Sequence, residues 1–209
     1  MFTGIFLFFA ILHIVVRMQG SNLPIDYFSK PIPILMIIIY VFSKKKEWMG
    51  WKTFSGKILL GLIFGITGDV LLMSPELFLP GLVSFLIGHI FYIFAFLPAV
   101  KLKFLMGAPL LLLGGSMGYY LSDKTGAMLI PVMLYLIVIL AMSWMALCRD
   151  KNLPNYSSIV VGSLFFILSD SFLALAKFTG LETGFNTAII MGTYYLAQYF
   201  IGYVGVKKS

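Results

Sequence analysis

Long apolar segments, interrupted only by short polar breaks, constrain this 209-residue chain more than any other feature of its sequence. A membrane hydrocarbon core about 30 Å thick is crossed by about 20 mostly apolar residues in a helix. Cutting the chain at charges and turn residues leaves eight such segments, which are residues 2–18, 30–42, 55–73, 80–100, 104–121, 127–147, 157–176 and 184–206. The second segment is short unless residues before Lys30 extend it. We therefore predict an all-α polytopic membrane protein, in which residues 1–209 form a single transmembrane domain of eight transmembrane helices.

The composition excludes the other broad classes of protein. Hydrophobic residues make up 60% of the chain and charged residues only 11%, which is too little polar surface to cover a soluble fold. The high apolar content argues against disorder, and Cys148 is the single cysteine, so there is no disulfide scaffold. A net charge of +7 does not require nucleic acid, because basic loops can gather on one side of a membrane. We expect membrane lipids as partners and no nucleic acid.

The basic residues predict an orientation. With the N-terminus in the cytoplasm, 11 of the 15 Lys and Arg residues lie on the cytoplasmic side and 4 on the other side, as the positive-inside rule requires. Both termini are then cytoplasmic, in the inner membrane if the source is bacterial. The first segment lacks a basic leader and a cleavage site, so we expect a retained helix and not a signal peptide. The run Lys44–Lys46 is interpreted as a topology signal that contacts anionic lipid.

Two segments about a hundred residues apart have similar sequences. Residues 61–69 read GLIFGITGD and residues 162–170 read GSLFFILSD, with the same spacing from glycine to aspartate. Four helices in each half would give parallel repeats related by an axis along the membrane normal, with halves 1–103 and 104–209. Chance similarity between two apolar helices is the alternative explanation.

Four ionisable side chains fall within the predicted spans: His13, Asp69, His89 and Asp170. Such a residue costs from about 2.5 to more than about 10 kcal/mol in a membrane, so each needs a partner, a cavity or a function. Asp69 and Asp170 both lie about 20 Å from the cytoplasmic ends of their helices, and we expect them to face one another. We also expect no intramembrane Lys or Arg to neutralise them. At least one should then hold its proton, because burial and a neighbouring like charge both favour the neutral form, and such a pair can act as acid and base.

Polar side chains with helical spacing accompany the aspartates. A stripe of small residues lies on the third segment, where Gly61, Gly65 and Gly68 allow a neighbouring helix to approach beside Asp69. Two further stripes are polar and join residues three or four positions apart, namely His89 with Tyr92, and Tyr194 and Tyr195 with Gln198. The alternative is structural: Tyr and Gln often form interhelical bonds worth about 0.6 kcal/mol, and a lone residue such as His13 is often a hydrogen-bonded packing residue.

A metal site and a covalent nucleophile are both disfavoured by the sequence. The two histidines and the two aspartates would suffice in number for zinc, but they lie on four different helices without a metal-binding spacing. Cys148 lies at a cytoplasmic helix end, far from the polar residues. We therefore predict no metal and no cofactor.

Five short motifs, taken together, resemble the YhhN family of membrane proteins, which includes the lysoplasmalogenases. The motifs are Lys30-Pro31, Gly68-Asp69 followed by Leu71-Leu72, Gly88-His89-Ile-Phe-Tyr92, Ser169-Asp170-Ser-Phe-Leu-Ala174 and Tyr194-Tyr195-Leu-Ala-Gln198. The resemblance covers nearly the whole chain. It implies an eight-helix enzyme with a lysophospholipid substrate, which hydrolyses the vinyl ether bond of a lysoplasmalogen to a fatty aldehyde and glycerophosphocholine or glycerophosphoethanolamine. The family also has members of unassigned activity.

This chemistry suits the predicted cluster of polar residues. Vinyl ether cleavage begins with protonation of the carbon β to oxygen, and water then adds to the oxocarbenium ion. Asp69 and Asp170 would share the acid and base roles, with the assignment open, while Lys30 at the outer mouth would hold the phosphate. The side chains expected to bind the substrate or to orient the water are His89, Tyr92, Tyr194, Tyr195 and Gln198. A proton-coupled transporter of a small or lipidic solute is the alternative function, and a lipid-binding protein without catalysis is a third.

Overall fold

A computed structural model describes residues 1–19, 24–44, 50, 52–180 and 183–209, and these residues form helices joined by short loops. A single isolated bridge, between Val100 and Arg149, is the only strand-like pairing in the described part of the chain. The α-helices are α1 (Phe2–Met18), α2 (Pro24–Ser29), α3 (Ile32–Ser43), α4 (Phe54–Leu71), α5 (Phe78–Phe96), α6 (Phe104–Ser122), α7 (Leu129–Leu147), α8 (Tyr156–Thr179), α9 (Gly184–Gln198) and α10 (Gly205–Lys207). The all-α prediction is confirmed for the described residues.

Among the described residues, seven helical segments are long and apolar enough to cross a membrane, with bounds close to those predicted from the sequence. They are Ile25–Ser43, Phe54–Leu71, Pro75–Ala99, Phe104–Ser122, Gly126–Leu147, Tyr156–Thr179 and Gly184–Lys207. Helix α1 is apolar but has only 17 residues. The prediction of membrane spans is thus confirmed for seven segments, and an eighth span at α1 stays a prediction.

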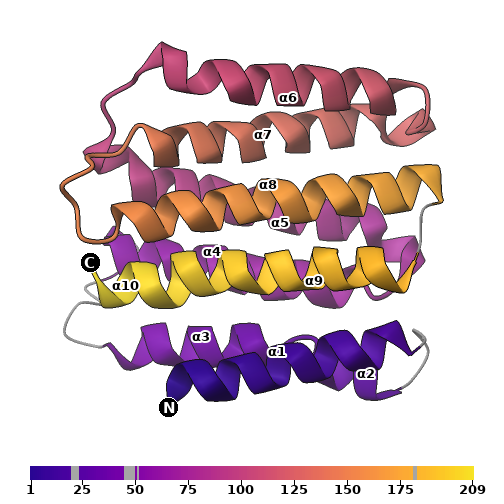
Figure 1. Ribbon diagram of the computed structural model, residues 1–209, viewed down its shortest axis with the longest axis horizontal. Coiled ribbons are helices and arrows are strands. Elements are labelled where there is room, and N and C mark those ends of the chain that lie inside the picture. The colour runs from indigo at the N-terminus through magenta and orange to yellow at the C-terminus, as the bar shows by residue number, and fades with distance from the viewer. Residues whose placement is uncertain (20–23, 45–49, 51, 181–182) are drawn as a thin grey trace.

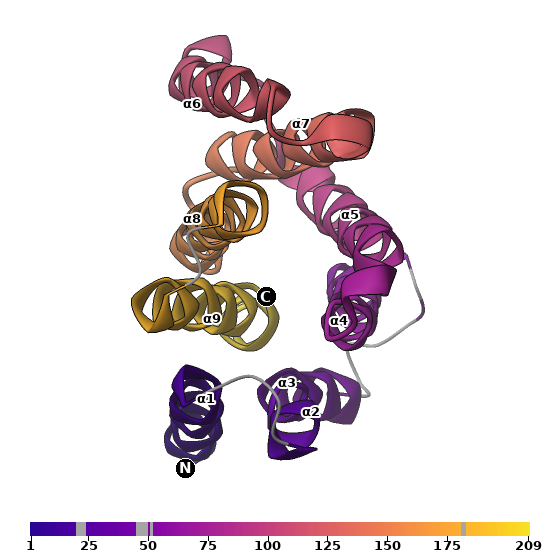
Figure 2. The same cartoon turned by 90° about the vertical axis from the view of Figure 1, so that its right-hand side faces the viewer.

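Seven helices follow one another around a ring, which is visible when the bundle is viewed along the helix axes (Figure 2). In order around the ring they are α1, α3, α4, α5, α7, α8 and α9. Helix α6 lies outside the ring and packs mainly against α7, and its Leu112 side chain is 77% exposed. The N-terminus and the C-terminus lie toward the same end of the bundle (Figure 1). The ring brings helices from both halves of the sequence to one shared interior.

The second span consists of two helices that are separated at Lys30-Pro31. Proline lacks a backbone N–H and fixes its own φ angle, so Pro31 and Pro33 can begin α3 but cannot continue α2. The described part of α2 begins at Pro24 and extends the span on the N-terminal side of Lys30. The break leaves Lys30 at a turn within the span, and its side chain points to α4.

The stripe of small residues predicted on α4 is confirmed at the contact with α5. A Cβ atom at Gly61 would lie 2.2 Å from the ring of Tyr92, and one at Gly68 would lie 2.5 Å from the ring of Phe85. In the other half of the chain, Gly162 of α8 lies similarly close to Ile201, which follows α9. This correspondence suits a repeat of four helices, but the repeat itself stays a prediction.

The last helical segment changes its geometry directly after Gln198. Residues Tyr199–Val204 form a π-helical turn, and α10 continues from it. Such turns occur mostly as local insertions in α-helices and frequently adjoin functional sites. Here Phe2 of α1 stacks on Tyr203 at a centroid distance of 4.1 Å, so the turn also anchors the first helix.

Arg149, which we counted as a charge in a cytoplasmic loop, is buried. Its side chain is 5% exposed and donates hydrogen bonds to the carbonyls of Ala95 and Phe96 at the end of α5, and to Asn155 Oδ1. Burial lowers the pKa of the guanidinium from its ordinary value, yet an arginine stays charged in proteins. The helix C-terminus supplies partial negative charge that favours a cation there. Asn155 in turn donates to the carbonyl of Gly205, so Arg149 joins three parts of the bundle at one end.

Candidate functional site in the interior of the ring

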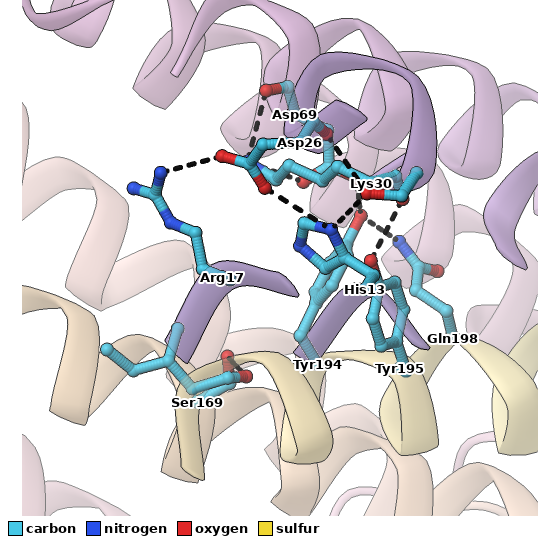
Figure 3. A network of polar contacts seen from close by, with 11 residues as sticks. His13, Arg17, Asp26, Lys30, Asp69, Ser169, Tyr194, Tyr195 and Gln198 are labelled. Carbon is cyan, nitrogen blue, oxygen red and sulfur yellow. Dashed lines mark hydrogen bonds and ion pairs between the residues drawn. The ribbon is translucent and has the colours of Figure 1, made fainter. Parts of the chain in front are cut away.

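Polar side chains of Lys30, Asp69 of α4, and Tyr194 and Gln198 of α9 lie close together within the ring (Figure 3). Tyr92 of α5 joins them through a hydrogen bond to Gln198. Asp69 itself is 2% exposed. The Tyr194 hydroxyl donates a hydrogen bond of 2.5 Å to Asp69 Oδ2. Since Tyr194 belongs to α9 and Asp69 to α4, this bond crosses the interior of the ring, and it gives one oxygen of the carboxylate a fixed partner.

Lys30 lies against Asp69 and not at an outer mouth. Its Nζ atom is 3.4 Å from Asp69 Oδ1 and donates to the backbone carbonyl of Asp69 at 3.1 Å. The side chain is only 14% exposed. The prediction that no basic residue neutralises the aspartates is therefore wrong for Asp69. The physical reason is the helix break at Pro31, which ends α2 inside the span and turns Lys30 toward α4.

The two predicted polar stripes meet in a chain of hydrogen bonds. The Tyr92 hydroxyl donates to Gln198 Oε1 at 2.7 Å, and Gln198 Nε2 donates to the Tyr194 hydroxyl at 3.3 Å. Together with the bond from Tyr194 to Asp69, this chain links α5 to α4 through α9. Gly65 is required beside it, because a Cβ atom there would lie 2.8 Å from Gln198 Nε2. Each polar group of the Gln198 amide thus has a partner, which fixes its orientation.

The neighbouring tyrosine of α9, Tyr195, binds the backbone at the break between α2 and α3. Its hydroxyl donates to the backbone carbonyl of Lys30 at 2.9 Å. The ring of His13 meets the ring of Tyr195 edge to face at 5.8 Å. Tyr195 therefore supplies a hydrogen bond to a carbonyl that has no helical partner because of the break. The same bond fixes the backbone of Lys30.

Asp170 has a different partner from Asp69. The Tyr135 hydroxyl of α7 donates a short hydrogen bond to Asp170 Oδ2. No Lys or Arg of the described residues pairs with Asp170, and the second carboxyl oxygen accepts no hydrogen bond within that part of the chain. Sequence reasoning missed Tyr135. Its only signal was a tyrosine in the middle of an apolar span, without a polar neighbour three or four positions away.

Aromatic rings connect the surroundings of the two aspartates. From Tyr194 the ring contacts run to Phe166 at 6.0 Å, on to His89 at 4.9 Å and then to Tyr135 at 5.4 Å. His89 is buried, and its Nδ1 atom has no hydrogen-bond partner among the described residues. Asp69 and Asp170 form no hydrogen bond with one another in the described structure. That they face one another across a chamber stays a prediction.

Asp170 and Tyr135 also border a pocket between α6, α7 and α8, which we call the α6–α8 pocket. It contains about 390 Å³ of empty space, part of which is open to the outside. Its lining residues are Met117, Leu121, Val132, Tyr135, Leu136, Ile139, Ile167, Asp170, Ser171 and Ala174. Asp170 thus borders an apolar pocket, while its partner Tyr135 contacts the ring of His89 on α5.

A second cluster of charged groups lies beside the first, between α1 and α2 (Figure 3). Arg17 donates to Asp26 Oδ2 at 2.7 Å, while His13 Nδ1 lies 3.4 Å from Asp26 Oδ1 and 3.0 Å from Ser29 Oγ. His13 is therefore a hydrogen-bonded residue of the helix interface. Asp26 was outside the predicted spans, and for that reason the sequence did not mark it as its partner.

The structure offers little for metal binding or for a covalent nucleophile in the part of the chain that it describes. No three His, Cys, Asp or Glu side chains lie together there as metal ligands. Residues 114–118 read GGSMG, which has the Gly-x-Ser-x-Gly spacing of a hydrolase nucleophile, but they lie within helix α6 and not on a strand-to-helix turn. The Ser116 hydroxyl donates to the carbonyl of Leu113. Cys148 is buried, and its sulfur accepts from the Lys103 N–H.

The sequence of the chain is similar to one family of proteins and to several named relatives. Residues 25–204 match the YhhN family. The chain is 29% identical to lysoplasmalogenase TMEM86A of Homo sapiens over 189 residues, which covers 86% of this chain and 77% of that protein. It is 31% identical to lysoplasmalogenase TMEM86B of Homo sapiens over 144 residues, or 67% of this chain and 59% of that protein. A third relative, lysoplasmalogenase TMEM86A of Bos taurus, is 27% identical over 187 residues, with 86% and 77% covered. No solved structure matches the chain.

Proposed function

The chain belongs to the YhhN family, and on this basis we propose that it is a membrane hydrolase that cleaves the vinyl ether bond of lysoplasmalogens. The products are a fatty aldehyde and glycerophosphocholine or glycerophosphoethanolamine. The relatives named lysoplasmalogenase support the reaction class. The observation that carries the mechanism is the unlike setting of two intramembrane aspartates, of which one is paired with an ammonium group and the other borders an apolar pocket.

The settings of the two carboxyl groups suggest an assignment of their roles. The ammonium of Lys30 and the hydroxyl of Tyr194 stabilise Asp69 as an anion. Asp170 has only a hydroxyl partner and an apolar pocket beside it, and these surroundings favour a neutral carboxyl. Two carboxyl groups with unlike surroundings take different roles in acid–base catalysis. In this proposal Asp170 is the acid and Asp69 is the base.

With these roles, the proposed reaction needs only the two aspartates, the substrate and water. Asp170 gives its proton to the carbon β to the ether oxygen, and the electrons of the double bond form the new C–H bond. The resulting oxocarbenium ion is stabilised by the negative charge of Asp69. Asp69 takes a proton from water as the water oxygen bonds to the cationic carbon. In the hemiacetal, the bond from this carbon to the glycerol oxygen breaks, and the glycerol oxygen takes the proton that Asp69 received from water. The hydroxyl proton of the hemiacetal passes to the Asp170 carboxylate as the C=O bond of the aldehyde forms, so both aspartates return to their starting states.

The neighbouring side chains position these groups. Lys30 keeps Asp69 charged, a role that replaces the phosphate contact expected from the sequence. Tyr92, Gln198 and Tyr194 form the chain that holds Asp69 Oδ2, and their polar atoms are available to orient the glycerol hydroxyl or the water. His89 and Tyr195 line the same interior through ring contacts.

The same proposal includes a membrane topology. Helix α1 is the eighth span, because its 17 residues are mostly apolar and it completes the ring between α3 and α9. Both termini are cytoplasmic, since the basic loops at residues 99–103 and 148–156 adjoin the end of the bundle where the chain begins and ends (Figure 1). Lys45 and Lys46 of the predicted topology signal lie outside the described residues. In a bacterial cell this places the protein in the inner membrane. The halves 1–103 and 104–209 are then parallel repeats of four helices.

A detergent assay tests the proposed reaction. Purified protein is incubated with alkenyl, alkyl and acyl lysolipids of equal chain length, and only the alkenyl lipid should release aldehyde. Asp170→Asn and Asp69→Asn should abolish release, while Asp123→Asn in an exposed loop serves as the matched control. Helical circular dichroism verifies that each variant is folded. Retained turnover in either of the first two variants would refute the mechanism, and transport that appears only in sealed vesicles would favour the carrier alternative.

A further inference from the structure

We propose that the α6–α8 pocket binds the hydrocarbon chain of the lysolipid and thereby determines which chain lengths the protein accepts. The inference rests on the proposed function, which defines the chemistry at Asp170. The pocket is lined by side chains from three helices, with Met117 and Leu121 on α6, and Val132, Leu136 and Ile139 on α7. Such an apolar lining with few polar groups is typical of a small-molecule site.

The position of the polar groups decides how a ligand is oriented there. Asp170, Ser171 and Tyr135 provide the polar atoms of the lining side chains. Ring contacts through His89 and Phe166 connect Tyr135, the partner of Asp170, to Tyr194, the partner of Asp69. A lysoplasmalogen has the same division, because its vinyl ether joins an apolar chain to a polar glycerophosphate. With the vinyl ether at Asp170, the chain extends into the pocket and the glycerol extends toward Asp69.

The packing of α6 gives such a chain access from the lipid. Helix α6 lies outside the ring (Figure 2), and its Leu111 and Leu112 side chains are 74% and 77% exposed. Because α6 supplies one wall of the pocket, this single helix separates the pocket from the outside of the bundle. A Cβ atom at Gly114 would lie 2.2 Å from Leu140, whereas one at Gly115 would meet nothing within 4 Å and one at Gly118 would meet only ordinary contacts. The contact with α7 is thus very close at Gly114 and less close one turn later at Gly118, where it involves only the side chains of Met133 and Leu136. The lining residue Met117 lies beside this looser part of the contact. A single hydrocarbon chain is the occupant that suits an apolar pocket beside such an exposed helix.

Two variants that narrow the pocket from opposite walls test the inference. Ala174→Phe adds a ring on α8, one helical turn beyond Asp170, and Met117→Phe does so on α6. The matched control is Ala108→Phe on the exposed face of α6. Binding is measured with alkyl lysolipids, which have an ether bond in place of the vinyl ether, at a short and a long chain length. Turnover of the matching alkenyl lysolipids is measured in parallel, and thermal unfolding verifies the fold.

The expected result is a loss of affinity for the long-chain alkyl lysolipid of at least tenfold in both pocket variants. Affinity for the short-chain lipid should change less than threefold, and Ala108→Phe should behave as wild type. Equal losses at both chain lengths, or an unchanged chain-length profile, would overturn the inference. So would a control variant that loses as much, or competition by a two-chain phospholipid as effective as by the lysolipid. If wild type binds with this dependence on chain length but cleaves no alkenyl lipid, the proposed function fails while the pocket assignment stands.

Discussion

Removal of the Lys30 ammonium should destabilise the protein, because it leaves Asp69 as an unpaired charge in the interior of the ring. Two unit charges at the 3.4 Å that separate Lys30 Nζ from Asp69 Oδ1 attract each other by about 5 kcal/mol at an effective dielectric constant of about 20. Breaking a buried ion pair by removing one partner costs about 3–5 kcal/mol in other proteins. We therefore expect Lys30→Met to lower the free energy of unfolding by about 3–5 kcal/mol.

The double variant Lys30→Met/Asp69→Asn separates this cause from lost packing. Without the aspartate charge there is no unpaired ion, so most of the stability should return, to within about 1–2 kcal/mol of wild type. The free energy of unfolding is measured in mixed micelles by titration with a denaturing detergent and followed by helical circular dichroism. Lys151→Met, in an exposed turn, is the matched control and should stay within about 0.5 kcal/mol of wild type. A double variant as unstable as Lys30→Met would refute the reasoning.

Three further predictions address other contacts. Tyr135→Phe removes the hydroxyl that donates to Asp170; kcat/KM for an alkenyl lysolipid should fall about tenfold to hundredfold, and an unchanged value would argue against a role in the reaction. Gly61→Ala places a methyl group against the ring of Tyr92 and should lower the free energy of unfolding by about 1–3 kcal/mol, whereas Gly115→Ala, which meets open space, should not. Arg149→Met should lower it by at least about 2 kcal/mol through lost hydrogen bonds to two helix-terminal carbonyls, with turnover of the remaining folded protein near that of wild type.

The spans were predictable because a membrane requires long apolar helices, and that requirement is written in local composition. The second span contains a helix break that composition does not predict. Lys30-Pro31 separates two helices within one crossing, and a hydropathy pattern reports the length of an apolar segment but not a change of direction inside it. The burial of Arg149 was not predicted either, because its place in a polar loop suggested exposure. The approach of α5 and α10 buries its side chain.

Within the site, helical spacing identified the faces but not the partners. The pairs Tyr92 with Gln198 and Tyr194 with Asp69 join residues more than a hundred positions apart, and their spacing on each helix predicted only that the side chains point inward. Tyr135 and Asp26 had no such spacing to mark them. Which helix lies opposite which is decided by packing around the ring, for instance by the glycines that admit Tyr92. That information is distributed over several helices, so no single segment contains it.

The interrupted second span also indicates what helix α1 contributes to the bundle. At Lys30 the backbone leaves its regular hydrogen-bond ladder, and the freed carbonyl is bound by a tyrosine hydroxyl of α9. Hydrocarbon offers no substitute for such a bond, so this irregular stretch has to be screened from acyl chains. Helix α1 lies across it, between α3 and α9. Helix α1 therefore shields the ion pair of Lys30 and Asp69 from the lipid hydrocarbon. Without α1, both charged groups would be exposed to the acyl chains.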